Sequence, residues 1–205
     1  LRVAVAGATG YIGRYVVREL VARGHEVVSL MRARSTSGRT KDSGALQRLL
    51  AGSEVRESEL IDYDSLMRDG VRDEPFDAVV SCIASRTGGI HDSRAVEYDA
   101  NHNLLKAAQQ AGAKSFVLLS AICVQRPRLA FQHAKLAFEA ELRDAGLAWS
   151  IVRPTAFFKS IAGQVPRIKA GKPYLIFGKG DGPACKPISE KDVASYIVDC
   201  LQSPA

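Results

Sequence analysis

Two patterns of apolar residues alternate along this chain. Short apolar runs, which are typical of buried strands, occupy residues 1–6, 26–31, 54–61, 76–83, 115–121, 147–152 and, more briefly, 173–177. Apolar residues spaced three to four positions apart, which are typical of one helix face, occupy the segment from Tyr11 to Gly24 and residues 45–50, 64–67, 92–112, 129–146 and 189–201. Strands that alternate with helices predict a Rossmann-like, doubly wound α/β fold with a parallel sheet.

The alternation is interrupted after residue 152. Residues 156–170 follow neither pattern, and we expect residues from about 155 to 188 to form a small substrate lobe near the C-terminus. A chain of 205 residues, of which 46% are hydrophobic, can bury one sizeable core, so we expect a single domain over residues 1–205. No apolar run approaches the length of a membrane-spanning helix.

A glycine-rich turn, residues 7–13 with the sequence Gly-Ala-Thr-Gly-Tyr-Ile-Gly, joins the first strand to the first helix. The unpaired N–H groups at the start of such a helix bind phosphate. Gly7 allows the tight turn, Gly10 lets the backbone approach the phosphates, and Gly13 lets the helix pack close to the strand. The alternative is an ordinary strand-turn-helix unit without a ligand. The residues predicted to bind the pyrophosphate of a dinucleotide are Gly7, Thr9, Gly10, Tyr11, Ile12 and Gly13.

Cations follow the second strand, where an NAD-binding chain would place an acidic residue for the ribose 2′-hydroxyl. Arg32 and Arg34 predict a bound 2′-phosphate and therefore NADPH, although a solvated pair of loop arginines is the alternative. Asp62 either accepts from the adenine amino group or caps a helix, and Asp64 is a candidate cap for the short helix around Leu66. Ala84 and Ser85 follow the fourth strand, and we expect them to pass beneath the cofactor.

The formal charge of +6 does not indicate nucleic acid, because the Lys and Arg residues are spread along the chain without a basic block. A small anionic ligand fits this distribution better. The four cysteines are far apart and lack metal-type spacing, so we expect no metal site and reduced, buried thiols. The chain starts at Leu1 within a strand, so we expect any targeting segment to have been removed.

The helix predicted at 129–146 carries Phe131, Lys135, Phe138 and Leu142 on one face. The chain resembles the atypical short-chain dehydrogenase/reductases through the glycine turn, Arg32, Arg153-Pro154 and residues 187–189 and 192–194. It more specifically resembles the NADPH-dependent divinyl chlorophyllide 8-vinyl reductase family over roughly residues 3–200. The segments that carry this narrower resemblance are 81–89, 118–125, 131–136, 151–160 and 185–189.

The resemblance implies hydride transfer from NADPH to the 8-vinyl group of a magnesium chlorin, divinyl chlorophyllide, in chlorophyll or bacteriochlorophyll biosynthesis. It implies that Pro154 contacts the cofactor and that the protein lies in the plastid of a plant or alga, or in the cytoplasm of a bacterium. Peripheral membrane association stays open. The family's chains continue beyond the last helix, so we expect this one to be truncated or partly unobserved at its end.

The chain departs from the wider superfamily at Phe131, where a tyrosine usually exchanges a proton with a substrate oxygen. Reduction of a carbon–carbon double bond forms no alkoxide, so this loss is compatible with a vinyl reductase. Lys135 is expected to hold the nicotinamide ribose; the alternative is an exposed helix lysine. Phe157, Phe158 and Lys159 are candidates to cover a flat macrocycle and meet its carboxylate, or else to be core and surface residues.

Two other functions fit the same motifs. One is a redox-sensing module that binds NADP without turnover, and the other is a carbonyl or isoflavone-type reductase. The proton donor for vinyl reduction also stays open. The candidates are water, Lys159, Lys186, Tyr98 and Tyr174.

Overall fold

The computed structural model describes residues 1–32, 43–175 and 186–202. In this part of the chain, six strands form one parallel sheet in the order β3-β2-β1-β4-β5-β6. This order is that of a doubly wound nucleotide-binding fold, so the predicted fold class is confirmed. The strands are β1 (Arg2–Ala6), β2 (Glu26–Met31), β3 (Glu54–Glu57), β4 (Ala78–Ser81), β5 (Ser115–Leu119) and β6 (Ala148–Val152).

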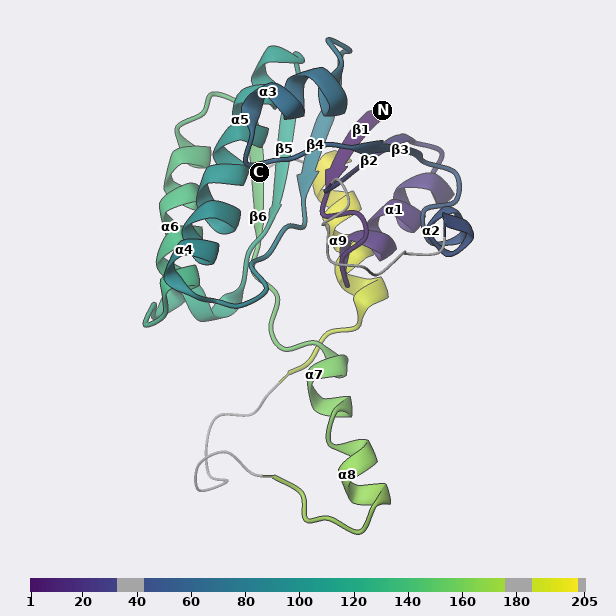
Figure 1. Ribbon diagram of the computed structural model, residues 1–205, viewed down its shortest axis with the longest axis vertical. Helices are drawn as coiled ribbons and strands as arrows, with labels where there is room; N and C mark the ends of the chain where they lie inside the picture. The colour runs from purple at the N-terminus through teal and green to yellow at the C-terminus, as the bar shows by residue number, and fades with distance from the viewer. Residues whose placement is uncertain (33–42, 176–185, 203–205) are drawn as a thin grey trace.

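Helices cover both faces of the sheet, α5 and α6 on one face and α1 and α9 on the other (Figure 1). The described helical segments are α1 (Gly13–Ala22), α2 (Ser43–Leu49), α3 (Tyr63–Ser65), the π-helical η1 (Leu66–Val71), α4 (Ile90–Ser93), the π-helical η2 (Arg94–Asp99), α5 (Ala100–Gln110), the 3₁₀ turn η3 (Ile122–Gln125), α6 (Ala130–Arg143), α7 (Phe158–Ala162), α8 (Val165–Lys169) and α9 (Glu190–Gln202). None of them is both long and apolar enough to cross a membrane.

The central strand β1 explains why the sheet needs cover on both sides. Its side chains alternate, so that Ala4 and Ala6 pack in the core beneath α5 and α6, whereas Val3 and Val5 pack beneath α1 and α9. A strand that is buried on both faces is apolar at every position. The unbroken apolar runs in the sequence are the direct result.

Several predicted boundaries differ from the structure. Except for β2, the strands are shorter than the apolar runs. The helix predicted at 92–112 begins at Ile90 and contains a π-helical segment, Arg94–Asp99. Residues 173–175 form no strand, and residues 176 and 177 lie outside the described part of the chain. The prediction that Asp64 caps the helix near Leu66 is wrong, because the Asp62 side chain accepts from the N–H groups of Asp64 and Ser65.

The cysteines are only partly as expected. Cys82, Cys123 and Cys200 are free thiols, and Cys185 lies outside the described residues. Cys82 and Cys200 are half-buried, but Cys123 is exposed, so its predicted burial is wrong. Cys123 follows the apolar run 115–121 and lies in the 3₁₀ turn after β5, where its side chain is exposed. Burial raises the pKa of the Cys82 thiol to about 12.

The helices α7 and α8 project away from the sheet, beyond the end of β6 (Figure 1). Backbone hydrogen bonds tie the base of this projection to the strand-like segment before α9: Phe158 donates to the Ile188 carbonyl, and Ile188 donates to the Ala156 carbonyl. None of the residues of α8 is buried. Residues 156–175, which include these two helices, therefore form an arm outside the sheet, and its role as a substrate lobe stays a prediction.

Candidate functional site

The glycine turn lies at the carboxyl end of β1, next to the end of β4. The strand order reverses between these two strands, and ligands of open parallel sheets bind at such a point. Gly7 has a φ of +77°, and a Cβ atom there would lie 2.7 Å from the Cys82 carbonyl oxygen. Only glycine fits this position, because any side chain would be strained and would also clash with the backbone of Cys82, directly after β4.

The other two glycines close the turn on itself. The Gly10 N–H donates to the Gly7 carbonyl at 2.8 Å, and a Cβ atom on Gly10 would lie 2.9 Å from that same oxygen. A Cβ atom on Gly13 would lie 2.1 Å from it. Gly13 therefore lets α1 pack directly against the glycine turn. The sequence predicted close packing of this helix against the strand, and the nearest backbone atom is instead the Gly7 carbonyl oxygen.

Free hydrogen-bond donors stand at the start of α1. Within the described residues, the N–H groups of Tyr11, Ile12 and Gly13 have no backbone acceptor, and no side chain caps the helix. Three unpaired donors at the positive end of a helix dipole fit an anionic group such as a pyrophosphate. The donor set thus agrees with a dinucleotide bound at this turn.

Arg32 is exposed directly after β2, while Arg34 lies outside the described residues. The Arg32 charge reaches the loop after β4, where Asp92 accepts from the N–H groups of Arg86 and Thr87 and from the Thr87 hydroxyl. Hydrogen bonds from Thr87 hold the pKa of Asp92 below its usual range, and Arg32 adds to this lowering. Arg32 therefore interacts electrostatically with Asp92, and its role toward a 2′-phosphate stays a prediction. The cap on α3 uses Oδ1 of Asp62, and the role of this carboxylate toward adenine stays a prediction.

Lys135 is buried, so the alternative of an exposed helix lysine is wrong. Its ammonium lies 2.8 Å from the Glu97 carboxylate, and the two side chains are 7% and 2% exposed. The other Glu97 oxygen accepts from the N–H and the hydroxyl of Ser85, each at 2.8 Å. One carboxylate therefore links α6 to the loop after β4.

A cavity of about 330 Å³ opens beside this ion pair. Its lining includes the predicted residues Ala84, Ser85 and Lys135, and Phe131 stands on its wall where a tyrosine would otherwise be. The other lining residues are Arg86, Thr87, Gly88 and Glu97. The sequence reasoning missed Glu97. A signal was available, because Glu97 precedes Ala100 and Leu104 by three and seven positions and so interrupts the buried stripe of that helix.

A second buried carboxylate fixes the ends of β5 and β6. Glu139 is fully buried, and it accepts from the Ser120 hydroxyl at 2.5 Å and from the Arg153 guanidinium. Burial raises the pKa of Glu139, but the hydrogen bonds from Arg153 and Ser120 outweigh this effect and leave the pKa below its usual value. This network holds Arg153, and with it Pro154, whose carbonyl accepts from the Ile122 N–H.

The three candidate substrate residues do not share one environment. The Phe157 ring is half-buried and meets the Tyr11 ring edge-on at 5.9 Å, and the Lys159 ammonium lies 4.2 Å from the centre of the Tyr11 ring. Phe158 is 51% exposed. The arm therefore brings Phe157 and Lys159 beside the glycine turn and leaves the Phe158 ring open to solvent.

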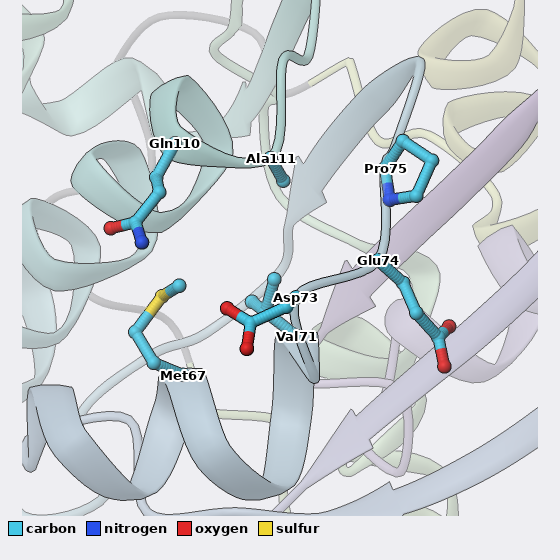
Figure 2. Close-up of a pocket in the computed structure, with 7 residues that line it drawn as sticks. All are labelled: Met67, Val71, Asp73, Glu74, Pro75, Gln110 and Ala111. Atoms are coloured by element: carbon cyan, nitrogen blue, oxygen red, sulfur yellow. The ribbon is translucent and has the colours of Figure 1, made fainter.

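Another cavity, of about 220 Å³, lies near the start of β4, at the end of the strands opposite the glycine turn (Figure 2). It is lined by Met67, Val71, Asp73, Glu74, Pro75, Gln110 and Ala111. None of the predicted site residues belongs to it. The glycine turn and the Lys135 cavity are therefore the candidate site.

Comparison with known proteins also indicates that the chain binds a nicotinamide cofactor. Residues 7–204 match the family described as NAD(P)H-binding. The chloroplastic divinyl chlorophyllide a 8-vinyl-reductase of Cucumis sativus is 53% identical over 97% of this chain, and the photosystem II assembly factor Ycf39 of Synechocystis is 27% identical over 98% of it. The matched regions are 49% and 59% of those proteins, so this chain spans about half the length of the cucumber relative.

A solved structure shares the fold. The triphenylmethane reductase of Citrobacter, complexed with NADP(H), aligns with a TM-score of 0.75 at 17% identity, over 99% of this chain and 64% of that one. At this identity the likeness concerns the arrangement of the sheet and helices.

Proposed function

The chain belongs to the NAD(P)H-binding family, and from this premise we propose that it binds NADPH and reduces the 8-vinyl group of divinyl chlorophyllide to an ethyl group. NADPH, when bound, supplies the hydride. The glycine turn holds the pyrophosphate, Arg32 meets the 2′-phosphate, and Lys135 meets the nicotinamide ribose. If the chain comes from a plant or alga, its place is the plastid, as the name of the cucumber relative says of that protein.

The reaction type rests on Phe131. This residue lines the cavity beside a buried Lys135, and a phenylalanine cannot exchange a proton with a substrate oxygen. Ketone reduction by the usual route is therefore disfavoured, whereas reduction of a carbon–carbon double bond does not need that hydroxyl. The substrate rests on the name of the cucumber relative, which is 53% identical to this chain.

The direct test mixes the purified chain with NADPH and divinyl chlorophyllide and follows the absorption shift to the monovinyl product. Formation of that product together with oxidation of NADPH supports the proposal. Binding of NADPH without product would support a second function, a module that holds the nucleotide without turnover. Phe131 also favours that function, since it removes the usual acid. Turnover of ketones in place of the vinyl substrate would contradict both.

The choice of cofactor depends on Arg32. We expect Arg32→Asp to weaken NADPH binding by roughly tenfold to a hundredfold, because a charge-assisted contact to the 2′-phosphate is replaced by repulsion between two anions. The affinity for NADH should stay the same or rise. Isothermal titration with both cofactors measures the two affinities.

The control for Arg32→Asp makes the same charge change at Arg18, an exposed residue on α1 outside the candidate site. Arg18→Asp should keep the NADPH affinity within about twofold, since exposed charges at a distance are screened by salt. Equal losses in the two variants would mean that overall charge, and not a contact with Arg32, governs binding.

Lys159 tests whether the arm contacts the substrate. Its ammonium stands over the Tyr11 ring beside the glycine turn, so a substrate carboxylate could reach it. We expect Lys159→Met to raise KM for the chlorin about fivefold, as for an exposed ion pair, with kcat little changed. Steady-state kinetics measure this split, with Lys169→Met on α8 as the control that keeps both values. A fall in kcat alone would instead identify Lys159 as the proton donor.

A further inference from the structure

Among the described residues that line the cavity beside Lys135, Glu97 is the only acidic one. It uses its two carboxylate oxygens for two different elements. Oε2 lies 2.8 Å from the Lys135 ammonium on α6, and Oε1 accepts from the N–H and the hydroxyl of Ser85 in the loop after β4. A single side chain therefore fixes the distance between the two elements that form the walls of the cavity.

The backbone of Glu97 is itself held in place. The Asn101 side-chain amide donates to the Glu97 carbonyl at 3.0 Å, and the Asn101 oxygen accepts from the Ser81 hydroxyl at 2.6 Å. All three side chains are buried. Glu97 also lies in the π-helical segment Arg94–Asp99, and π-helical turns within α-helices occur frequently at functional sites.

Stability alone does not explain a buried ion pair at this position. Desolvation of the two charges offsets most of their attraction, and a well-packed apolar pair is often as stable. The pair instead lines a cavity in which Phe131 stands at the position of the usual tyrosine. The Lys135 ammonium has one other neighbour among the described acceptors, the Leu119 carbonyl at 3.5 Å. Glu97 is thus the main determinant of where the ammonium points.

We propose that Glu97 is a positioning residue for the nicotinamide end of the site. It orients the Lys135 ammonium toward the ribose. Its hydrogen bonds with Ser85 also hold the loop after β4 in the position expected to contact the cofactor. This inference rests on the proposed function, because it requires that Lys135 and the loop contact NADPH. It adds a residue to the site that acts through its neighbours and does not itself touch the substrate.

The test uses Glu97→Gln, which keeps an acceptor for Ser85 and removes the charge that orients Lys135. We expect the affinity for NADPH, measured by fluorescence titration without substrate, to fall roughly tenfold, as for the loss of one hydrogen bond to a charged group. The matched control is Glu74→Gln. Glu74 also pairs with a buried cation, Arg56 at 2.5 Å, but it lies near the start of β4 and does not line the cavity.

We expect both glutamine variants to lose thermal stability, so the comparison of their NADPH affinities separates a positioning role from a structural one. Glu74→Gln should keep its affinity within about twofold, since its ion pair with Arg56 lies at the opposite end of the strands from the glycine turn. Equal affinities for wild type and Glu97→Gln would overturn the inference. If wild-type protein bound no NADPH, the proposed function itself would fail, and this outcome is distinct.

A double-mutant cycle tests whether Glu97 acts through Lys135. In a Lys135→Met background, Glu97→Gln should change the NADPH affinity by less than about twofold, because the group that Glu97 orients is absent. The double variant also removes both buried charges together, so it tests the inference even where Glu97→Gln alone does not fold. A full tenfold loss in this background would show that Glu97 does not act through Lys135 and would overturn the inference.

Discussion

Gly10→Val is expected to abolish NADPH binding while leaving a folded protein. The Gly10 N–H already donates to the Gly7 carbonyl, and a Cβ atom would lie 2.9 Å from that oxygen, so the turn must open to accept a side chain. The free N–H groups of Tyr11 and Ile12 would then no longer converge on one anion. Loss of two charge-assisted hydrogen bonds weakens binding by at least about a hundredfold. Titration with NADPH and circular dichroism measure the two outcomes.

The control for this prediction makes the same substitution at the other end of the same helix. Gly24 follows α1 with a φ of +78°, and a Cβ atom there would meet nothing within 4 Å. Gly24→Val should therefore lower the free energy of unfolding by about 1–2 kcal/mol through backbone strain and keep the NADPH affinity. NADPH affinity that is unchanged in Gly10→Val would mean that the glycine turn is not the phosphate site.

The fold could be predicted because its signals are local. Buried parallel strands require unbroken apolar runs, and β1 provides one with Val3 and Val5 on one face and Ala4 and Ala6 on the other. The positions where the sequence misled are those that local signals do not determine. The choice between Asp62 and Asp64 as the helix cap is one such case, since both residue types cap helices and only the backbone path decides.

The site could be predicted only in part, for a related reason. The glycine turn is contiguous in sequence, so its spacing identified it. The partnership of Glu97 with Lys135 spans 38 residues and depends on how α6 packs against η2, which no short motif records. Ser120 likewise lies near the end of an apolar run in the sequence, and only the fold shows that its hydroxyl donates a hydrogen bond to Glu139. Polar groups that pair across elements are visible only once the elements are packed.

A buried aromatic residue, Phe138, packs the helix that carries Lys135 against the sheet. Phe138 lies three positions after Lys135, is fully buried, and packs against the Phe116 ring of β5 with 5.9 Å between the ring centres. Removal of a buried phenylalanine side chain loses its transfer free energy and leaves a cavity. We therefore expect Phe138→Ala to lower the free energy of unfolding by about 3–5 kcal/mol. For a chain of this size, the melting temperature should fall by roughly 6–20 °C in thermal unfolding monitored by circular dichroism.

Phe158 provides the matched control, because it is the same residue type with 51% of its surface exposed. Phe158→Ala should change the free energy of unfolding by less than about 0.5 kcal/mol, as is usual for surface substitutions. If the Phe158 ring covers the chlorin, which is one of the two roles predicted for it from the sequence, the same variant should raise KM for that substrate. Stability losses of equal size in the two variants would mean that the arm is packed in solution, and that Phe158 is a core residue and not a free surface for the substrate.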